Sequence, residues 1–335
     1  MGKKHFKALV VRENGENNFV RAIENRSTDE LPAGDLLVEV HYSSLNYKDM
    51  LSATGNRGVT KNYPHTPGID AAGIVVSCGD GSFKLGDEII VTSYDLGMNT
   101  WGGFGQYIRV PAAWAVPKPA GLSLQESMIY GTAGLTAGLS VNRLLGWISG
   151  PDRGDILVTG AAGGVGSMAV SILSHLGYSV TALQGPADAE DFLKKCGARK
   201  IIAPDEAADT PTWPLLKERF AGCIDTLGGE VLTFAIKSTM AGGAVTCCGN
   251  VVSPDLALTV YPFILRGVTL FGIDSQNCPM PLRRKIWSNL AGEWKFPWLT
   301  DLAGEITLEG LEEEFAIIKT GKHRGRSVVA VKGRS

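Results

Sequence analysis

At 335 residues and 44% hydrophobic, the chain is long enough to bury a large core, and it exceeds the size at which a single core usually divides. Its 32 basic and 34 acidic residues are well mixed and give a net charge of −2, which excludes an electrostatic footprint for nucleic acid or an anionic membrane surface. No stretch reaches transmembrane length, the N-terminus lacks the apolar run of a signal peptide, and the six cysteines show no framework spacing. We therefore expect a two-domain cytoplasmic protein with reduced cysteines.

Residues 6–120 are punctuated by glycine and proline, with short β-branched runs between them. One interruption, Leu45–Gly55, has the pattern of a short helix that ends at a glycine. Short strands with frequent turn signals predict a β-rich, barrel-like domain. The expected strands are Phe6–Val11, Leu36–His41, Ala72–Ser77, Glu88–Thr92 and Tyr107–Val110.

The composition and hydrophobic pattern of the sequence change at Ser123. Ser123 and Glu126 have the spacing of a capping box, and the Ala- and Gly-rich segment Ser127–Leu145 predicts a closely packed helix. Pro151–Asp155 then forms a turn into the next strand. The first domain boundary is expected in this region.

A glycine-rich turn follows, between a predicted strand and a predicted helix. Ile156–Val158 is an apolar run suited to a strand buried on both faces, and Val165–Leu176 has helical spacing that ends at Gly177. Between them lie Gly160, Gly163, Gly164 and Gly166, in a G-x-x-G-x-x-G spacing. Glycine lets the backbone approach a pyrophosphate, and the start of a helix offers unpaired N–H groups, so the turn predicts a dinucleotide site. The spacing differs from the usual G-x-G-x-x-G, and an ordinary glycine-rich turn is the alternative.

Strands and helices alternate after this turn, which predicts a doubly wound parallel sheet. Strands are expected at Tyr178–Leu183, Lys200–Ala203, Cys223–Asp225, Ala244–Cys248, Val268–Ile273 and Ser327–Val331, and helices at Ala187–Lys195, Trp213–Phe220, Val231–Met240, Leu282–Gly292 and Leu308–Lys319. A ligand of such a sheet lies at the carboxyl ends of its strands.

Eight blocks in this order resemble the medium-chain dehydrogenase/reductase superfamily, and most of all its zinc-free, quinone oxidoreductase-like YhdH/YhfP group, which includes acrylyl-CoA reductases. The blocks are Ser43–Asp49, Pro67–Gly73, Gly131–Gly134, Thr159–Gly166, Asp225–Gly229, Pro262–Arg266, Gly272–Ser275 and Arg324–Arg326. The resemblance implies a GroES-like catalytic domain over residues 1–125 and a Rossmann domain over residues 126–267. It also implies that residues 268–335 return to the catalytic domain, and that the protein is a homodimer.

The sequence argues against a metal ion. Zinc-dependent relatives carry Gly-His-Glu where this chain has Gly68-Ile69-Asp70, and it has no C-x-x-C pair. Without a Lewis acid, the remaining chemistry is hydride delivery to an acceptor that is already polarised. The sequence gives no sign of a buried carboxylate pair, a Ser-His-Asp set or a P-loop.

The choice of nicotinamide depends on the end of the second strand of the sheet. An NAD site places an acidic residue there, about twenty residues after the glycines. This chain has Gln184, followed by Gly185 and Pro186, which favours NADPH over NADH. Lys194, Arg199 or Lys200 are candidates to compensate for Asp188 and Asp191 near a 2′-phosphate.

The resemblance implies the remaining site residues. Tyr47 is expected over the nicotinamide, where its phenol would orient the ring or donate a proton, with Asn46 and Asp49 fixing the turn. The pyrophosphate is expected on Ala162, Gly163, Gly164, Val165 and Gly166. Asn250, Ile264 and Ser275 are expected at the nicotinamide end, with simple packing roles as the alternative.

These features predict an NADPH-dependent oxidoreductase that transfers a hydride to an activated C=C bond, such as that of an acrylyl-CoA-like thioester or an enone. A quinone reductase with the same residues is the first alternative. The second, from another class, is a nucleotide-binding protein with little turnover, similar to the quinone oxidoreductase-like crystallins.

Overall fold

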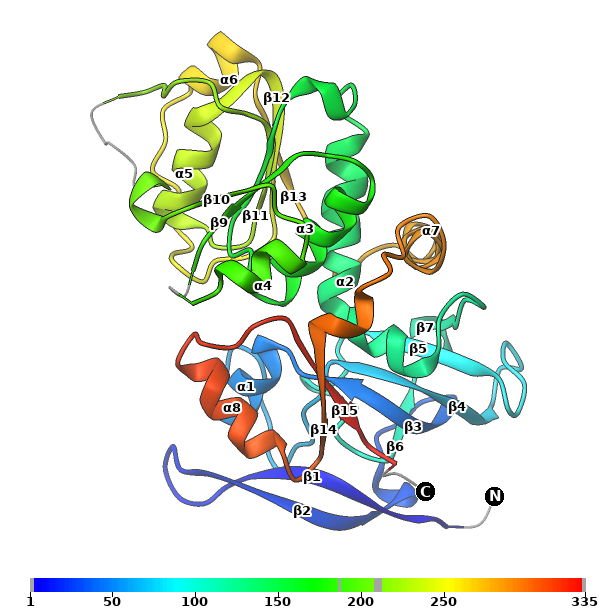
Figure 1. Cartoon of the computed structure of the whole chain (residues 1–335). Coiled ribbons are helices and arrows are strands. Elements are labelled where there is room, and N and C mark those ends of the chain that lie inside the picture. Colours follow the sequence, from blue (N-terminus) through cyan, green and yellow to red (C-terminus); the bar gives the residue numbers. More distant parts are fainter. Residues whose placement is uncertain (1–2, 186–187, 208–212, 333–335) are drawn as a thin grey trace. The chain divides into compact units, whose positions relative to one another are not determined.

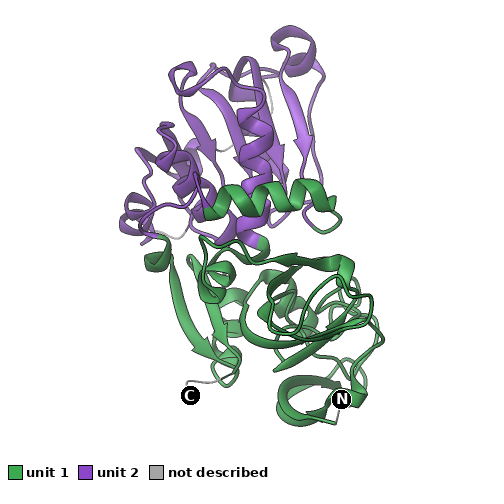
Figure 2. Cartoon of the chain, turned by 90° about the vertical axis from the view of Figure 1, so that its right-hand side faces the viewer, with its two compact units in different colours: residues 1–132, 276–291, 299–335 green, residues 133–275, 292–298 purple. Residues whose placement is uncertain are grey.

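The computed structural model describes residues 3–185, 188–207 and 213–332 (Figure 1). The chain forms two compact units (Figure 2). The first combines residues 1–132, 276–291 and 299–335, and the second combines residues 133–275 and 292–298. The sequence-based boundaries lie after residues 125 and 267.

The first unit is rich in β-structure, as expected. β1 (His5–Glu13) and β2 (Phe19–Ser27) pair as an antiparallel hairpin. The main sheet has the order β14 (Ala303–Thr307), β15 (Arg326–Ala330), β3 (Leu36–Ser44), β4 (Asp70–Cys78), β5 (Glu88–Thr92) and β7 (Ala115–Pro117), with β6 (Tyr107–Val110) also paired to β3. Its pairs are antiparallel except for β14 with β15. Alternate side chains of these strands form one apolar core.

Helices complete the first unit. They are α1 (Tyr47–Ala53), the start of α2 (Leu124–Leu145), α7 (Met280–Ala291) and α8 (Leu311–Lys319), with the short 3₁₀ helices Thr28–Glu30, Ala112–Trp114 and Leu299–Leu302. The capping box predicted at Ser123 is confirmed, because Glu126 N donates to Ser123 Oγ at 3.0 Å and Ser123 N donates to a Glu126 carboxylate oxygen at 2.8 Å. α2 is kinked at Gly131, whose φ of 51° is outside the helical range.

The second unit contains a six-stranded parallel sheet, which confirms the doubly wound fold. Its order is β10 (Lys200–Ile202), β9 (Val180–Leu183), β8 (Ile156–Val158), β11 (Phe220–Asp225), β12 (Thr239–Cys247) and β13 (Thr269–Gly272). The order reverses between β8 and β11, which is where a parallel sheet of this kind binds its ligand.

Helices connect these strands. They are α3 (Gly164–His175), α4 (Glu190–Lys195), α5 (Gly229–Ser238) and α6 (Tyr261–Arg266), with 3₁₀ turns at Pro151–Arg153 and Pro204–Ala207. α5 and the second half of α2 lie on opposite sides of the sheet (Figure 1). α4 begins later than the predicted helix, whose first residue, Ala187, lies outside the described residues.

The helix predicted at Trp213–Phe220 is wrong. Trp213–Arg219 has no regular structure, and Phe220 already begins β11. Leu216 N donates to Lys237 O at 3.1 Å and Arg219 N donates to Ser238 O at 2.9 Å, so these amides bond to the end of α5 instead of to their own turn. The strands β2, β7 and β14 and the helix α6 were not predicted.

Among the described residues, no helix is both long and apolar enough to cross a bilayer.

Candidate functional site

The glycine turn joins the central strand β8 to the start of α3. Gly163 is the N-cap residue and supplies no side chain to the first amides of the helix, so these N–H groups face outward without an intrahelical partner. A Cβ on Gly166 would overlap the Gly160 carbonyl and lie 2.7 Å from Ala161 Cα. A Cβ on Gly163 would meet only Gly160 O, at 3.3 Å. Gly166 therefore permits close packing of the turn, whereas Gly163 leaves room for a ligand beside the amides.

A buried carboxylate holds this turn through hydrogen bonds. Asp225, at the end of β11, accepts hydrogen bonds from Thr159 Oγ1 at 2.7 Å and from Gly228 N at 2.9 Å. Thr159 Oγ1 in turn accepts from Thr226 N at 3.0 Å. Burial raises the pKa of Asp225, while the hydrogen bonds it accepts act in the opposite direction. The carboxyl ends of β8 and β11 are therefore tied together where the strand order reverses.

Several predicted residues lie at the same edge of the sheet. Gln184 follows β9 directly, with its N–H bonded to Ile202 O at 2.9 Å. Asn250 follows β12 and is exposed, next to Gly228 of the β11 loop. Ser275 lies beyond β13 and accepts from Thr136 Oγ1 at 2.8 Å. Gly185 is exposed, and Pro186 lies outside the described residues.

Ile264 does not lie at this edge. It is 67% exposed on α6, which precedes β13 in the chain. On the same helix, Arg266 Nη1 donates to Lys237 O at 2.8 Å, at the end of α5. Because α5 runs back from the carboxyl end of β11 to the amino end of β12, this bond places Ile264 at the amino ends of the strands.

The three basic residues proposed near the end of the second strand lie at the amino ends of the strands or form an ion pair with a carboxylate. Lys200 Nζ bonds Asp155 at 2.6 Å, before the start of β8. Arg199 N donates to Val180 O at 2.9 Å, at the amino end of β9. Lys194 pairs with Glu190 at 2.6 Å. None of them is placed next to Gln184 by these contacts.

In the first unit, Tyr47 is the first residue of α1 and is 52% exposed. The preceding residue, Asn46, donates its N–H to Asp49 Oδ2 at 2.8 Å. Asp49 is fully buried, and its Oδ1 accepts from Ile69 N at 2.8 Å and Gly68 N at 3.1 Å. Asn46 and Asp49 thus fix the turn that presents Tyr47, as predicted.

A second buried carboxylate, Asp70, lies beside this turn. Asn46 Nδ2 lies 2.7 Å from Asp70 Oδ2 and 3.4 Å from Asp49 Oδ2, so one amide contacts both carboxylates. Burial and the Asp70 carboxylate raise the pKa of Asp49 to about 7. The expectation that the chain has no buried carboxylate pair is therefore wrong. It failed because Asp49 and Asp70 are brought together by the pairing of β3 with β4, which residue types alone do not reveal.

Sequence reasoning assigned no role to three further residues around Asp70. Ser44 and Thr132 donate to its carboxylate, and Arg326 is buried nearby, where burial lowers the pKa of its guanidinium while Asp70 and Asp49 act in the opposite direction. All three lie in blocks that carry the family resemblance. An arginine directly before the predicted strand Ser327–Val331, within one of these blocks, was the available signal.

These groups do not fit a zinc ion. The oxygens of Asp49 and Asp70 are occupied by N–H and O–H donors from the protein. Across residues 3–185, 188–207 and 213–332, no three His, Cys, Asp or Glu side chains gather in a way that could hold a metal ion.

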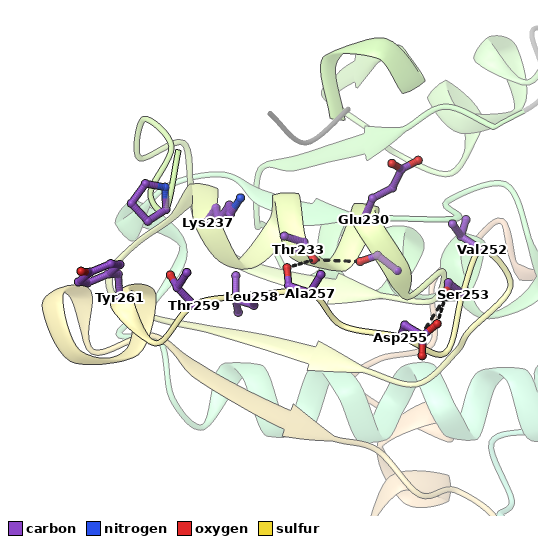
Figure 3. A pocket seen from close by; sticks show the side chains of 12 residues that line it. Glu230, Thr233, Lys237, Val252, Ser253, Asp255, Ala257, Leu258, Thr259 and Tyr261 are labelled. Atoms are coloured by element: carbon purple, nitrogen blue, oxygen red, sulfur yellow. Dashed lines mark hydrogen bonds between the residues drawn. The ribbon is translucent and has the colours of Figure 1, made fainter. Parts of the chain in front are cut away.

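A separate hollow lies along α5 (Figure 3). Glu230, Thr233 and Lys237 line it from the helix, and the segment from Val252 to Tyr261 lines it from the other side. No residue of the glycine turn and no predicted site residue contributes to its lining. The hollow is therefore distinct from the phosphate cradle.

Comparisons with known proteins agree with the folds of both units. Residues 32–120 match the alcohol dehydrogenase GroES-like domain, and residues 164–291 match the zinc-binding dehydrogenase domain. The chain is 42% identical to the putative quinone oxidoreductase YhfP of Bacillus subtilis, over 97% of this chain and 98% of that protein. The chain belongs to the medium-chain dehydrogenase/reductase superfamily, in its YhdH/YhfP group. It is an NAD(P)-dependent oxidoreductase, and its barrel-type unit is the GroES-like domain.

Two further relatives have a comparable sequence identity over nearly their full length. The acrylyl-CoA reductase AcuI of Ruegeria pomeroyi is 41% identical over 97% of this chain and 99% of that protein. The YhdH oxidoreductase of Salmonella enterica, solved in complex with NADP, is 39% identical with a TM-score of 0.93, covering 97% of this chain and 99% of the other. The YhfP protein has been solved with NAD bound, with a TM-score of 0.95, 40% identity and coverage of 98% and 100%.

Proposed function

We propose that this protein is a zinc-independent, NADPH-dependent reductase of activated C=C bonds, with an acrylyl-CoA-like enoyl thioester or an enone as acceptor. The observation that carries the proposal is the uncapped start of α3 at the strand-order reversal, in a chain 41% identical to an acrylyl-CoA reductase. The bound nicotinamide supplies the hydride. The protein supplies the amides of residues 164–166 for the pyrophosphate and Tyr47 for the nicotinamide ring.

The chemistry of the first unit supports an acceptor that needs no metal. Its buried carboxylates accept hydrogen bonds from the protein, and the described residues hold no group of side chains that could bind a Lewis acid. An enone or enoyl thioester is already polarised by its own carbonyl, so hydride addition to the β-carbon leaves negative charge on that oxygen. Hydrogen-bond donors stabilise this charge, and Tyr47 or water then protonates the α-carbon.

NADPH is the preferred cofactor in this proposal. Gln184 replaces the acidic residue that binds the ribose hydroxyls in an NAD site, and one close relative has been solved with NADP. Another has been solved with NAD, and no lysine or arginine contact near Gln184 supports 2′-phosphate binding. Fluorescence titrations with NADPH and NADH should give the lower Kd for NADPH, and the reverse order would refute the preference.

The acceptor is tested by following NADPH absorbance with acrylyl-CoA, crotonyl-CoA and a 1,4-quinone offered separately. We expect the thioesters to have the highest kcat/KM. Oxidation with the quinone alone would support the alternative of a quinone reductase, as the name of the Bacillus relative suggests. NADPH binding without oxidation by any acceptor would support a nucleotide-binding protein with little turnover.

We further propose a homodimer formed through β13. In the part of the chain that the structure describes, β13 pairs only with β12 and is an edge strand. Among the described residues, seven of the twelve exposed large hydrophobic side chains lie in the adjoining segment: Val251, Val252, Leu256, Val260, Tyr261, Ile264 and Leu265. An open strand edge beside exposed apolar side chains favours pairing with a second copy.

Such a dimer would account for Ile264. Two edge strands related by a two-fold axis run antiparallel, so the amino end of one lies beside the carboxyl end of the other. Ile264 of a second copy would then approach the strand ends that carry Ser275. Light scattering should give a dimer for the wild type and a monomer for Ile264→Lys, while Leu85→Lys, which changes a side chain 74% exposed in the other unit, should remain dimeric.

We place the protein in the cytoplasm. All six cysteines are free, as expected in a reducing compartment.

A further inference from the structure

Basic side chains gather near the C-terminus, in a segment that the candidate site does not include. After Glu314 the sequence contains six lysines and arginines and no acidic residue. Three of these basic residues, Lys319, Lys322 and Arg324, lie at the end of α8 or in its connection to β15. The two lysines are exposed, and the arginine is partly buried. We call residues 319–325 the basic loop.

The backbone of the basic loop is fixed at both ends. Gly321 and Gly325 have φ angles of 70° and 61°, in the left-handed region that favours glycine. His323, between them, is tied to β15, because its Nε2 lies 2.9 Å from Ser327 Oγ. A ligand that binds to side chains of this loop therefore has little backbone to order, which favours binding.

The carboxylates that precede the loop in α8 are directed to other partners. Glu314 Oε2 accepts from Ser327 Oγ at 2.8 Å and lies 3.4 Å from His323 Nε2. Glu312 pairs with Arg21 at 2.6 Å. Neither contact involves the lysines or the arginine of the loop, whose like charges favour an anionic ligand.

The basic loop lies beside the turn that presents Tyr47. β15 runs antiparallel to β3, and Leu45 N, just after β3, donates to Ser327 O at 2.9 Å. The residues that precede β15 are therefore neighbours of those that follow β3, which include Tyr47 and Lys48. In addition, α1 and α8 lie side by side (Figure 1). The loop and Tyr47 thus share one edge of the main sheet of the first unit.

The distance from this edge to the basic side chains is limited by the chain. Arg324 is three residues and Lys322 five residues before Ser327, so their Cα atoms lie at most about 11 Å and about 18 Å from that of Ser327. An enoyl thioester of coenzyme A carries its phosphates at the far end of an extended pantetheine arm. A phosphate site is therefore expected beside the reacting centre and not in it.

Coenzyme A has the anionic groups that suit this loop, namely a diphosphate and a 3′-phosphate. A guanidinium binds a phosphate through two parallel N–H bonds, and its five donors allow Arg324 to do so while it keeps a contact within the protein. The ammonium of Lys322 adds a flexible point charge. A quinone or a simple enone has no group that would use these charges.

We propose that the basic loop binds the phosphates of a coenzyme A thioester through Lys322 and Arg324, while the enoyl group reaches the nicotinamide at Tyr47. This inference rests on the proposed function and narrows its acceptor to a coenzyme A thioester. Lys319 is not part of the proposal, because a cation at the end of α8 is accounted for by the helix dipole.

Acrylyl-CoA and acrylylpantetheine test this, because they share the thioester and differ only in the 3′-phospho-ADP moiety. The wild type should have the higher kcat/KM with acrylyl-CoA. A hydrogen bond to a charged group contributes about tenfold or more to binding, so the ratio of the two kcat/KM values should fall about tenfold in Lys322→Gln and in Arg324→Gln. The change should appear in KM for acrylyl-CoA, and Arg324→Lys should regain part of the ratio.

Lys332→Gln is the matched control. Lys332 is an exposed lysine that follows β15, at the end of the strand opposite to the loop, where it pairs with Glu39 at 3.1 Å. This variant should keep the wild-type ratio. A wild-type ratio in both Lys322→Gln and Arg324→Gln would overturn the proposal. So would a tenfold rise in their Kd for NADPH, because the loop would then bind the cofactor phosphates.

Binding of coenzyme A itself separates this proposal from the proposed function. If the wild type oxidises NADPH with no acceptor, the reductase assignment fails, but calorimetry with the NADPH-saturated protein still reports whether coenzyme A binds. We expect the wild type and Lys332→Gln to bind it, and a variant with both Lys322→Gln and Arg324→Gln to bind it at least about tenfold more weakly. If acrylyl-CoA and acrylylpantetheine are reduced equally well, and coenzyme A does not bind, the reductase assignment stands and the role of the loop is refuted.

Discussion

Tyr47 is the residue whose role is easiest to test, because its side chain is half exposed and contributes little to the core. Replacing it with phenylalanine removes the phenol and keeps the ring. If the phenol donates the proton, general acid catalysis of this kind contributes about 100-fold or more, so kcat should fall by about that factor while the Kd for NADPH stays nearly constant. Steady-state kinetics with the best acceptor give both values. Tyr261→Phe, at a similarly exposed tyrosine of the other unit, is the control, and an unaltered kcat in Tyr47→Phe would exclude the phenol from catalysis.

The sequence predicted single residues well where their neighbours in the chain decide their role. Asn46 and Asp49 are three residues apart, so their hydrogen bond across a helix start was foreseeable. Asp70 bonds partners 24, 26 and 62 residues away, and Arg326 bonds a carbonyl 281 residues away. No local pattern records such contacts. The network around Asp70 therefore became visible only with the pairing of β3, β4 and β15.

At the scale of elements, the glycine turn makes a prediction that separates folding from binding. In Gly166→Ala the new methyl group meets the Gly160 carbonyl, so Tm should fall even without cofactor. In Gly163→Ala the methyl group has only Gly160 O nearby, at 3.3 Å, and would occupy space needed by the pyrophosphate. This variant should keep its Tm but bind NADPH at least about tenfold more weakly, a loss of about 1.4 kcal/mol.

Thermal unfolding without cofactor and fluorescence titration with NADPH measure these two effects. Gly304→Ala, in β14 with open space around the position, is the control for a glycine substitution in the other unit. Equal losses of Tm in the Gly163 and Gly166 variants would contradict the distinction between them.

Elements with a strong local pattern were predicted closely. Glu88–Thr92 and Tyr107–Val110 coincide with β5 and β6, because apolar and β-branched runs bounded by turn residues define both ends. β14 was not predicted because Ala303–Thr307 has a weak hydrophobic alternation, and its strand conformation depends on pairing with β15. The apolar spacing of Trp213–Phe220 suggested a helix, but its amides bond the end of α5. In these segments tertiary hydrogen bonds, not local preference, determine the backbone.

For the whole molecule, the order of domains followed from composition, but the route of the last segments did not. The β-rich beginning and the alternating middle are evident from turn residues and hydrophobic periodicity. Residues 292–298 return to the second unit, where Trp298 Nε1 donates to Ser171 Oγ of α3 at 3.3 Å. A short aromatic segment of this kind has no signal that assigns it to one domain. Such contacts contribute to the stability of the second unit.

His65 makes the stability of the protein sensitive to acid. Its ring is buried, which lowers its pKa below the ordinary 6.5, while the Gly97 backbone and Asp95 act in the opposite direction. Below pH 6.5 the unfolded chain therefore binds a proton that the folded protein excludes, and the free energy of unfolding must fall as the pH falls. One such group changes the slope by at most about 1.4 kcal/mol per pH unit. His65→Asn keeps a side-chain amide to donate to Gly97 but cannot titrate.

Urea unfolding of the wild type and His65→Asn between pH 8 and pH 5 tests this. The two curves of unfolding free energy against pH should run parallel above pH 7 and converge below it, because only the wild type loses stability through this histidine. Asp49 acts in the opposite sense, since its raised pKa of about 7 favours the folded state as the pH falls, but it does so equally in both proteins and cancels in the difference. Parallel curves down to pH 5 would mean that His65 is protonated in the folded protein as readily as in the unfolded chain, and that its burial has no effect on acid stability.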